Sequence, residues 1–319
     1  MQQGEPKDSS LGRAVLLDEF GGPEVLRVCD VAAPHAGPGQ IRVRVKAAGL
    51  NPMDWIMTAD AAAGARFRLS LPSGFGTDFA GVVDEVGEGV TDFSLGDRCF
   101  GAALSRAVAD FVVVNVPGNI ATGVAHHTPE GVDDRTAAAL TIAASTAAAA
   151  LAVLGLGPGD TVLIGGAAGG VGVFAVQLAR LAGARVIGTG SEASSGYLRD
   201  LGAEPVAYGE GLVDRVRALA PGGVTAALDL HGTDTVEAAR ELGVPDRRIC
   251  MIAAVLPGVS AANGANAAEG ALEGVADLIA TGRLRVPIAA TFPIAQIREA
   301  VQLQSNRHVR GKVVIDLEA

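Results

Sequence analysis

The chain has 319 residues, a formal net charge of -10, and 49% hydrophobic but only 4% aromatic residues. This length predicts two domains, each large enough to bury its own core. The acidic balance would repel a phosphate backbone, so we expect no nucleic-acid partner. The longest apolar run, residues 137–156, contains hydroxyl side chains and a glycine. It is too polar for a membrane span and predicts a buried helix, so we expect no membrane partner.

The cysteines and the N-terminus indicate the compartment. Cys29, Cys99 and Cys250 lie far apart in the sequence, without the spacing of a metal site or a redox pair. Residues 1–10 are polar, carry both charge signs and lack the apolar stretch of a signal peptide. We therefore expect a cytoplasmic protein that begins with a disordered tail at residues 1–10.

Residues 11–122 have the pattern of an antiparallel β domain. Short runs of period two alternate with turns rich in Gly, Pro and Asp. This pattern predicts a β-barrel or a closed sandwich. The strands are expected at Arg13–Leu17, Gln40–Lys46, Ala80–Val86, Asp97–Phe100 and Asp110–Val114.

The pattern changes near Thr128, where helical sequence begins and buried strands start to alternate with helices. We therefore place an α/β domain with a doubly wound parallel sheet at residues 123–261. Its strands are expected at Thr161–Ile164, Arg185–Gly188, Pro205–Ala207, Val224–Leu228 and Arg248–Ala253. Residues 262–319 should contain helices at Glu273–Ala280 and Pro293–Gln304 and a last strand at Lys312–Leu317.

The glycine-rich turn Gly166-Ala167-Ala168-Gly169-Gly170-Val171-Gly172 joins the first expected strand of this sheet to a helix at Val173–Leu181. In that context, Gly169 would let the main chain approach a pyrophosphate, and Gly172 would let the helix pack on the strand. The helix N-terminus would add free N–H groups and partial positive charge. The turn therefore predicts a dinucleotide site, the alternative being a turn that is only tightly packed.

The end of the second strand of the sheet indicates which dinucleotide is bound. An acidic residue there usually bonds the ribose hydroxyls of NAD and would repel the 2′-phosphate of NADP. Here the stretch Ile187–Ser191 has no carboxylate before Glu192. Gly190 and Ser191 are also small enough to leave room for a phosphate. The sequence therefore favours NADP(H) over NAD(H).

Five segments of the chain together match a known family. They are Gly49-Leu50-Asn51-Pro52-Met53-Asp54-Trp55, Gly76-Thr77-Asp78-Phe79-Ala80-Gly81, Gly96-Asp97-Arg98, the turn Gly166–Gly172 with Gln177-Leu178-Ala179, and His308-Val309-Arg310-Gly311-Lys312-Val313-Val314. On these segments the chain resembles the zinc-independent quinone oxidoreductase (zeta-crystallin-like) branch of the medium-chain dehydrogenase/reductase superfamily. The resemblance implies a Rossmann domain inserted into a GroES-like β-barrel catalytic domain made from both chain ends. It also implies a small-molecule substrate and a homodimer.

The zinc enzymes of that superfamily hold a catalytic metal with a cysteine and a histidine-glutamate pair. The matching positions here are Asn51 and Thr77-Asp78. An amide and a hydroxyl cannot replace a thiolate and an imidazole, and the clustered cysteines of the structural zinc lobe are missing. We therefore expect no metal.

Without a metal, the reaction needs another group to stabilise the oxygen anion that forms on the substrate. The catalytic candidates are Asn51 as hydrogen-bond donor, Asp54 as loop anchor or proton relay, and Trp55 as an apolar wall. Asp54 could equally be a buried acceptor that caps backbone amides. Related enoyl reductases often use a tyrosine in the following loop, but this chain has no tyrosine before Tyr197. In that loop, residues 58–73, Phe67 and Arg68 are candidates for a lid.

The resemblance also assigns the cofactor site. Family members often place a cation against the 2′-phosphate at the position of Ser195, so its loss here predicts weak NADPH affinity or relaxed cofactor choice, with Arg199 as a substitute. The nicotinamide is expected near Ile252–Val255 and Lys312, and Thr146 is expected to face the cleft. The cofactor-binding residues are Thr146, Ala167, Ala168, Gly169, Gly170, Val171, Gly190, Ser191, Ser195, Tyr208, Ile252, Ala253, Val255 and Lys312.

The adjacent histidines His126 and His127 could be interpreted as metal ligands. Neighbouring side chains point apart on most backbones, and no third ligand lies at a useful spacing. We expect an exposed loop pair. His231, after the fourth expected strand, should line the cofactor site rather than act on the substrate.

These observations predict an NADPH-dependent reductase that transfers hydride to a quinone or to an α,β-unsaturated carbonyl compound. Two alternatives remain on the same fold. The altered loop is compatible with a biosynthetic enoyl reductase or a non-redox cyclase. The missing tyrosine and the missing cation are compatible with an NADPH-binding sensor or scaffold protein without turnover.

Overall fold

The computed structural model describes residues 11–319, and the tail expected at residues 1–10 lies outside them. The described chain forms two compact units. The first contains the chain up to Leu140 together with Ala290–Asn306 and Val313–Ala319, and the second contains Thr141–Ala289 and Arg307–Lys312. These boundaries differ from the expected ones after residues 122 and 261, and the assignment of domains stays a prediction.

The antiparallel part of the fold is built on strands whose alternate residues are buried, as in β3, where Ile41, Val43 and Val45 are at most 3% exposed. Its strands are β1 (Leu11–Leu17), β2 (Arg27–Ala32), β3 (Gln40–Leu50), β4 (Ser73–Gly74), β5 (Asp78–Val86), β6 (Arg98–Ala102), β7 (Phe111–Asn115), β8 (Val124–His127), β15 (Ile288–Pro293) and β16 (Lys312–Asp316). Its helices are α1 (Pro52–Ile56), α2 (Ala61–Arg66), α3 (Asp134–Ala137) and α10 (Ile297–Ser305).

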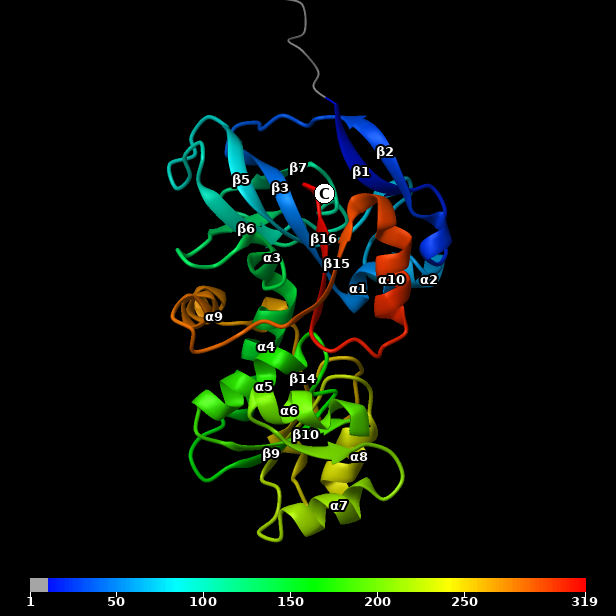
Figure 1. Ribbon diagram of the computed structural model, residues 1–319, viewed down its shortest axis with the longest axis vertical. Helices are drawn as coiled ribbons and strands as arrows, with labels where there is room; N and C mark the ends of the chain where they lie inside the picture. The colour runs from blue at the N-terminus through cyan, green and yellow to red at the C-terminus, as the bar shows by residue number, and fades with distance from the viewer. Residues whose placement is uncertain (1–10) are drawn as a thin grey trace, which may run out of the picture. The chain divides into compact units, whose positions relative to one another are not determined.

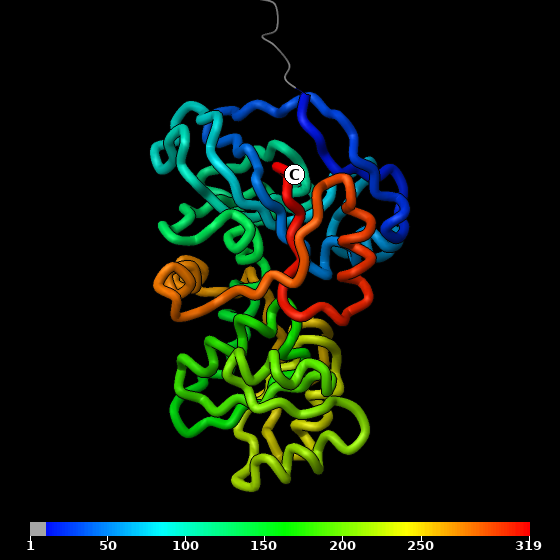
Figure 2. The backbone as a smooth tube through the Cα atoms, in the orientation of Figure 1, coloured from blue at the N-terminus to red at the C-terminus, as the bar shows by residue number. Residues whose placement is uncertain are grey.

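Strand β3 pairs with three strands of the seven-stranded sheet, β16, β5 and β7. The strand order is β15-β16-β3-β5-β6-β8, and β7 lies off this path. The C-terminal strand β16 runs antiparallel to β3 with Val313 opposite Leu50, and Figure 2 shows this end of the chain beside the N-terminal part. Strand β5 pairs with the other edge of β3, and its first residue, Asp78, lies opposite Gly49. This register brings the chain just after β3 next to the start of β5.

The second unit is a parallel sheet with helices on both sides (Figure 1). The strand order is β11-β10-β9-β12-β13-β14, and each of the five neighbouring pairs is parallel. Counted from β9, this is the order 3-2-1-4-5-6 of a Rossmann fold, which confirms the predicted fold class. Its strands are β9 (Thr161–Gly165), β10 (Arg185–Gly190), β11 (Glu204–Ala207), β12 (Ala226–Asp229), β13 (Ile249–Met251) and β14 (Ser260–Ala261). Its helices are α4 (Thr141–Leu154), α5 (Gly172–Leu181), α6 (Ser195–Leu201), α7 (Leu212–Leu219), α8 (Asp234–Glu241) and α9 (Ala271–Ala280).

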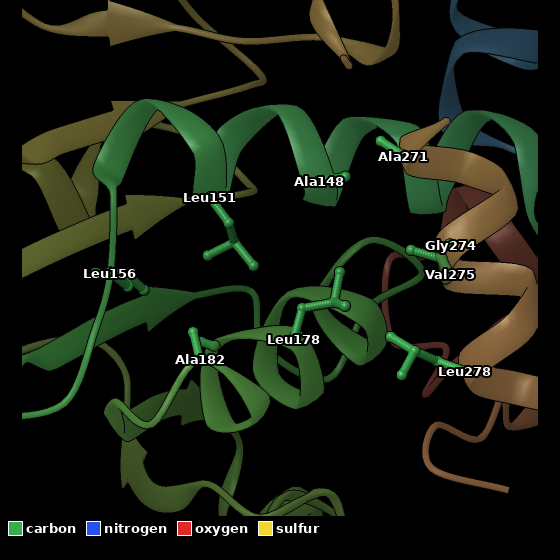
Figure 3. Close-up of a pocket in the computed structure, with 10 residues that line it drawn as sticks. Ala148, Leu151, Leu156, Leu178, Ala182, Ala271, Gly274, Val275 and Leu278 are labelled. Carbon is green, nitrogen blue, oxygen red and sulfur yellow. The ribbon is translucent and has the colours of Figure 1, made fainter. Parts of the chain in front are cut away.

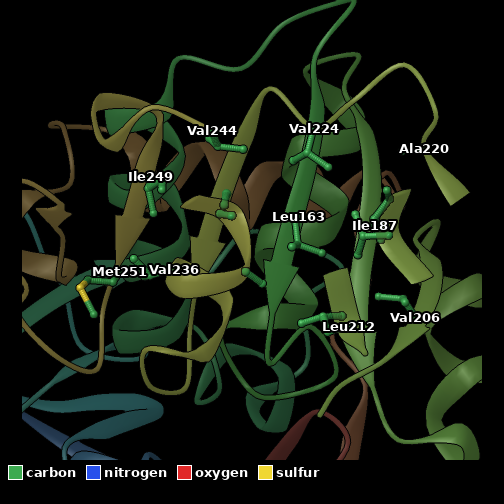
Figure 4. Packing of buried hydrophobic residues seen from close by; sticks show 14 of the residues in the cluster. Leu163, Ile187, Val206, Leu212, Ala220, Val224, Val236, Val244, Ile249 and Met251 are labelled. Carbon is green, nitrogen blue, oxygen red and sulfur yellow. The ribbon is translucent and has the colours of Figure 1, made fainter. Parts of the chain in front are cut away.

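Helices α7 and α8 bury apolar side chains against one face of the parallel sheet (Figure 4). Val216 and Val236 of these helices are 0% exposed, as are Leu163, Ile187 and Ile249 of the strands. Burying side chains of this size contributes about 1.5–3 kcal/mol each. This core fixes the strand ends that carry the candidate cofactor site. Among residues 11–319, no helix is long and apolar enough to cross a membrane.

Two expectations about local structure are wrong. His126 and His127 lie in β8, paired with Phe100 and Cys99 of β6, and not in a loop. The His127 ring stacks on Phe93 with a centroid distance of 4.3 Å. The antiparallel sheet therefore extends past the boundary expected after residue 122. The sequence did not predict β8 because its pairing partner, β6, is distant in the sequence. Helical structure resumes only at α3, later than the expected start near Thr128.

The segments 58–73 and 288–304 also differ from expectation. The first, expected as a loop, contains α2, whose N-cap Asp60 accepts a hydrogen bond from Ala63 N–H at 2.8 Å. In the second, the helical segment expected from Pro293 starts as a 3-10 turn at Ile294–Gln296 and continues as α10 from Ile297, while Pro293 is the last residue of β15.

Candidate functional site

The glycine-rich turn joins β9 to α5 and is held in a tight conformation. Gly166 has a φ of +69°, in the left-handed region that favours glycine. Its N–H donates to Thr189 Oγ1 at 3.2 Å, and Gly169 N–H donates to the Gly166 carbonyl oxygen at 3.0 Å. A Cβ atom at Gly172 would lie 2.4 Å from the Ala167 carbonyl oxygen, so only glycine lets the first turn of α5 approach the strand this closely.

This turn offers free donors at the N-terminus of a ten-residue helix. Among residues 11–319, we find no hydrogen-bond acceptor for the backbone N–H groups of Ala168, Gly170 and Val171. Such groups, with the helix dipole behind them, favour an anion. The turn therefore has the chemistry of a site for the pyrophosphate of a dinucleotide.

Residues near the C-terminus lie against the same turn. Gly311 N–H donates to the Ala168 carbonyl oxygen at 3.0 Å, and a Cβ atom at Gly170 would lie 3.2 Å from Cδ of Lys312. Lys312 is 2% exposed. The aliphatic part of Lys312 therefore covers Gly170, which places this cofactor candidate beside the expected pyrophosphate turn.

The end of β10 is more crowded than its sequence indicates. Gly190 is buried, and a Cβ atom there would lie 2.8 Å from Leu198 Cδ1 and 3.3 Å from Ser194 Cβ. The side of Gly190 on which a Cβ would lie is thus filled by Leu198 and Ser194, and the expected role of Gly190 at a phosphate stays a prediction. Ser191 Oγ lies 3.0 Å from Ser194 Oγ, and Ser195 begins α6 without supplying a cation.

Positive charge reaches this region from elsewhere in the chain. Burial raises the pKa of Tyr197, in α6, to about 12, and the nearby guanidinium groups of Arg285 and Arg310 act against that rise. These two exposed arginines therefore lie close to α6 although each is more than 80 residues away in the sequence. Tyr208, at the end of β11, is 57% exposed, and its N–H donates to the Gly190 carbonyl oxygen at 3.4 Å.

The loop after β12 also approaches the turn. Asp229 is 2% exposed and accepts from the N–H groups of His231, Gly232 and Thr235 at 2.8–2.9 Å. The Oγ1 atom of Thr235 lies 2.0 Å from where a Cβ of Gly165 would be. Sequence reasoning missed Asp229 and Thr235, although an aspartate at a strand end before a glycine-containing loop is typical of such capping.

Three further cofactor candidates occupy the loop after β13. Ile252 N–H donates to the Asp229 carbonyl oxygen at 3.1 Å, so this loop runs beside the one after β12. Ala253 is exposed and Val255 is 83% exposed. Thr146, in α4, is buried, and its hydroxyl donates to the Ile142 carbonyl oxygen at 2.6 Å. The roles of these four residues stay predictions.

The catalytic candidates of the first unit form a buried hydrogen-bond network. Asn51 Nδ2 donates to Asp78 Oδ2 at 2.9 Å, and Asn51 N–H donates to Asp54 Oδ2 at 2.8 Å. Thr77 Oγ1 donates to Asp54 Oδ1 at 2.6 Å. All four residues are at most 3% exposed. The segments 51–54 and 77–78 of the resemblance are thus joined in space. Asp54 is a buried acceptor here, and whether it also relays a proton stays a prediction.

The remaining candidates of this unit lie around that network. Trp55, next to Asp54, is half-buried, and its carbonyl oxygen accepts from Thr58 Oγ1 at 3.1 Å. Phe67 and Arg68 directly follow α2, and Arg68 has a φ of +57°. Nothing in the structure tests the wall and lid roles expected of these three side chains.

Comparison with known proteins identifies the family. Residues 37–128 match the alcohol dehydrogenase GroES-like domain, and residues 201–315 match the family described as zinc-binding dehydrogenase. A quinone oxidoreductase from Rattus norvegicus is 37% identical over 201 residues, which cover 61% of this chain and 58% of that protein. The quinone oxidoreductase structure from Coxiella burnetii is 26% identical, with a TM-score of 0.77, covering 97% of this chain and 100% of that one. The two matched domains are those of the medium-chain dehydrogenase/reductase superfamily, and within it this chain is similar to quinone oxidoreductases.

A larger relative aligns with nearly the whole chain. The phthioceranic/hydroxyphthioceranic acid synthase of Mycobacterium tuberculosis is 32% identical over 92% of this chain, but the match covers 15% of that protein. The chain thus spans over half the length of the rat oxidoreductase and a small part of the synthase. Members of the medium-chain dehydrogenase/reductase superfamily bind a nicotinamide dinucleotide.

The family description raises the question of zinc. Proteins hold zinc mainly with thiolate, imidazole and carboxylate groups. At the positions that the resemblance matches to zinc ligands, the Asn51 amide is bonded to Asp78 and the Thr77 hydroxyl to Asp54. Among residues 11–319, no three His, Cys, Asp or Glu side chains are grouped so as to hold a metal. The donor set present at these positions does not fit a catalytic zinc.

A hollow of about 480 Å³ in the Rossmann unit is a separate feature (Figure 3). Figure 3 shows Leu151, Leu178 and Leu278 pointing into it from three helices. It lies toward the C-terminal end of α5, whereas the glycine turn is at the N-terminal end. Its lining has no polar side chain and cannot supply the donors that a pyrophosphate needs. The lining residues are Ala148, Leu151, Leu156, Leu178, Ala179, Ala182, Ala271, Gly274, Val275 and Leu278.

Proposed function

We propose that this protein is an NADP(H)-dependent reductase that transfers hydride to a quinone or to an α,β-unsaturated carbonyl compound without zinc. The observation that carries the proposal is the tight turn Gly166–Gly172 with its free N–H donors, in a sheet of Rossmann order. The oxidoreductases among its relatives support the reaction class. A bound nicotinamide would supply the hydride, and the protein would bind, orient and protect the reactants.

The preference for NADP(H) is supported by charge. Ser191 stands where NAD enzymes carry an acidic ribose ligand, and the first carboxylate after it, Glu192, is exposed. The guanidinium groups of Arg285 and Arg310 act on Tyr197 of α6, and we propose that they supply the positive charge that Ser195 lacks. Guanidinium groups bind phosphate well because their planar donors match its oxygens.

In this proposal Asn51 donates a hydrogen bond to the substrate oxygen as negative charge develops on it. Its Nδ2 atom donates to Asp78 Oδ2 at 2.9 Å. Preorganised donors of this kind are worth about 10²–10³ in kcat in other enzymes. The carboxylate of Asp54 holds the Asn51 backbone, so we assign it a structural role and propose that the proton comes from water.

A panel of quinones, enones and enoyl thioesters, assayed with NADPH and with NADH, tests the proposal. We expect turnover with NADPH and a loss of kcat of about 10²-fold in Asn51→Ala. We also expect Ser191→Asp to weaken NADPH more than NADH binding, because the new carboxylate would repel the 2′-phosphate. A catalytic preference for NADH in the wild type would contradict the assigned cofactor, and stoichiometric zinc in the purified protein would contradict the metal-free mechanism.

The contribution of Arg285 and Arg310 to NADPH binding can be tested separately from the reaction itself. Arg310→Ala should raise the Kd of NADPH about tenfold and leave that of NADH unchanged, which corresponds to about 1.4 kcal/mol. Arg283→Ala is the matched control, since Arg283 is exposed and lies two residues from Arg285. Equal effects of Arg310→Ala on both cofactors would argue against a role for Arg310 at the 2′-phosphate.

A biosynthetic enoyl reductase is the second candidate. It is favoured by the alignment of 92% of the chain with a segment of the mycobacterial synthase. Turnover of enoyl thioesters but not of quinones would support it. Tight NADPH binding without oxidation by any acceptor would instead indicate a cyclase, a sensor or a scaffold. We further propose a homodimer, which sedimentation of the purified protein would test.

A further inference from the structure

The side chain of Gln177, in α5, binds the backbone of a residue that is distant in the sequence. Its Oε1 atom accepts from the Arg285 N–H at 3.1 Å, and its Nε2 atom donates to the Arg285 carbonyl oxygen at 2.9 Å. The same Nε2 atom donates to the Val173 carbonyl oxygen, one turn earlier in α5, at 2.6 Å. The oxygen and both N–H groups of this amide are therefore in use.

These three bonds fix the orientation of the Gln177 amide. If the amide were turned over, its oxygen would face the carbonyl oxygens of Val173 and Arg285, and its nitrogen would face an N–H group. The segment 285–287 lies between α9 and β15. It is thus held on α5 by a side chain that cannot turn without losing all three bonds.

The start of β16 binds the other end of the segment 285–287. Lys312 N–H donates to the Pro287 carbonyl oxygen at 3.0 Å. Gly311 has a φ of +96°, and a Cβ atom there would lie 2.2 Å from the same oxygen. Only glycine allows this approach. Residues 311–312 therefore pack against the segment backbone to backbone, and a shift of Pro287 would shift them as well.

Gly311 also binds the glycine-rich turn. Its N–H donates to the Ala168 carbonyl oxygen at 3.0 Å. The N–H of the same peptide unit, that of Gly169, donates to the Gly166 carbonyl oxygen at 3.0 Å. Both polar groups of this peptide unit are thus held. If the unit were free to rotate, its carbonyl oxygen could turn toward a bound phosphate and repel it, whereas the site needs N–H groups there.

The turn, α5, the segment 285–287 and residues 311–312 thus form a closed ring within the Rossmann unit, joined by the hydrogen bonds given above. We propose that Gln177 is a positioning residue for the dinucleotide site, which acts through this ring to keep the Ala168 carbonyl oxygen turned away from the pyrophosphate. This inference rests on the proposed binding of a dinucleotide at the turn. The pyrophosphate is common to NADPH and NADH, so loss of Gln177 weakens both by the same factor.

Gln177→Met tests the proposal, because methionine keeps the length of the side chain and removes all three bonds. We expect the Kd values of NADPH and NADH, measured by fluorescence titration, to rise by the same factor of about five, the size of one net hydrogen bond. Unchanged Kd values would overturn the proposal. A rise confined to NADPH would overturn it as well, since the effect would then act at the 2′-phosphate.

Thr281→Ala is the matched control for Gln177→Met. The Thr281 hydroxyl donates to the Asp277 carbonyl oxygen at 2.7 Å, four residues earlier, and so makes the same kind of bond at the end of α9. Its bonds go to carbonyl oxygens of α9 and not to the segment 285–287. The variant should bind both dinucleotides with wild-type Kd. A rise equal to that in Gln177→Met would show a general effect of surface bonds and would refute the positioning role.

Amide hydrogen exchange tests the ring without a cofactor. In Gln177→Met the Arg285 N–H loses its acceptor and should exchange faster. If the ring couples Gln177 to the turn, the N–H of Gly311 should also exchange faster, by about fivefold. Faster exchange at Arg285 with the wild-type rate at Gly311 would overturn the proposal, because the loss of Gln177 would then end at the segment 285–287.

Gly311→Ala opens the same ring at a second point and completes a double-mutant cycle. It should raise the Kd of both dinucleotides, and Gln177→Met should add less in this background than in the wild type, because the two changes break one ring. Additive effects would overturn the proposal. If Gly311→Ala does not fold, the exchange of Gly311 N–H in Gln177→Met decides. Raised Kd values in Gly311→Ala with wild-type values in Gln177→Met would refute only the role of Gln177. A wild-type protein that binds neither NADPH nor NADH would refute the proposed function, and this inference with it.

Discussion

Gly172 lies so close to Ala167 that a Cβ atom on Gly172 would be 2.4 Å from the Ala167 carbonyl oxygen and 2.5 Å from its carbonyl carbon. Both contacts are to backbone, which cannot move without opening the turn. We therefore expect Gly172→Ala to raise the Kd of the dinucleotide at least about tenfold, by about 1.4 kcal/mol, because the N–H donors lose their arrangement. Fluorescence titration with NADPH would measure this change.

Gly196 provides the matched control for that substitution. It lies in α6 of the same unit, is exposed, and a Cβ atom there would meet nothing within 4 Å. Gly196→Ala should bind NADPH with wild-type affinity. If both variants bind equally well, the close approach of α5 to the strand is not needed for cofactor binding.

The reactivity of the three cysteines follows from their burial. Burial, with the charges of Asp97 and Asp134, raises the pKa of Cys99 to about 12, and burial raises that of Cys250 to about 11. The thiolate is the reactive form, so neither residue should react with a thiol reagent at pH 8. Cys29 is partly exposed and should react alone.

Titration with a chromogenic disulfide reagent would test this. We expect one equivalent of thiol in the native protein, none in Cys29→Ser, and three equivalents in wild-type protein unfolded in urea. Rapid modification of two thiols in the native protein would show that Cys99 or Cys250 is more accessible than its burial indicates.

Most of the fold could be predicted from local patterns, and the site only in part. The turn Gly166–Gly172 was recognisable because its strand, its helix and its glycines are contiguous in the sequence. The bond between Asn51 and Asp78 could not be derived, since it depends on the register of β3 against β5 and on irregularities in that pairing. The electrostatic influence of Arg310 on Tyr197 in α6 also joins residues far apart in the sequence and has no local signal. Two-residue strands such as β4 are too short to have a period.

Asp160 should make the stability of the Rossmann unit depend on acid pH. Its carboxylate accepts from Thr225 Oγ1 at 2.6 Å, from Gly157 N–H at 3.0 Å and from Arg248 at 2.5 Å. The hydrogen bond from the Thr225 hydroxyl, followed by those from Gly157 and Arg248, lowers the pKa of Asp160. Because the folded pKa lies below the unfolded value of about 4, the stabilisation is complete above pH 4 and is lost as pH falls through the folded pKa.

Asp160→Asn removes this dependence. At pH 7 the variant should be less stable by about 2 kcal/mol, since hydrogen bonds to a charged group are worth about 1.5–3 kcal/mol. The difference between variant and wild type should shrink below pH 4, where the wild-type carboxylate also becomes protonated. Urea unfolding at several pH values would measure it. A difference that stays constant from pH 7 to pH 3 would exclude the carboxylate charge as its source.

Asp229 should be the most sensitive position of the loop after β12. Its carboxylate accepts from three backbone N–H groups, those of His231 and Gly232 on Oδ1 and that of Thr235 on Oδ2. Asp229→Ala would leave these donors without an acceptor in a largely buried place, at a cost of about 3 kcal/mol in the free energy of unfolding. Asp229→Asn keeps Oδ1 and should cost less. Asp234→Ala, an exposed change in the first turn of α8, should stay within about 1 kcal/mol of the wild type. If Asp229→Ala costs no more than Asp234→Ala in urea unfolding, the loop after β12 does not depend on these three bonds.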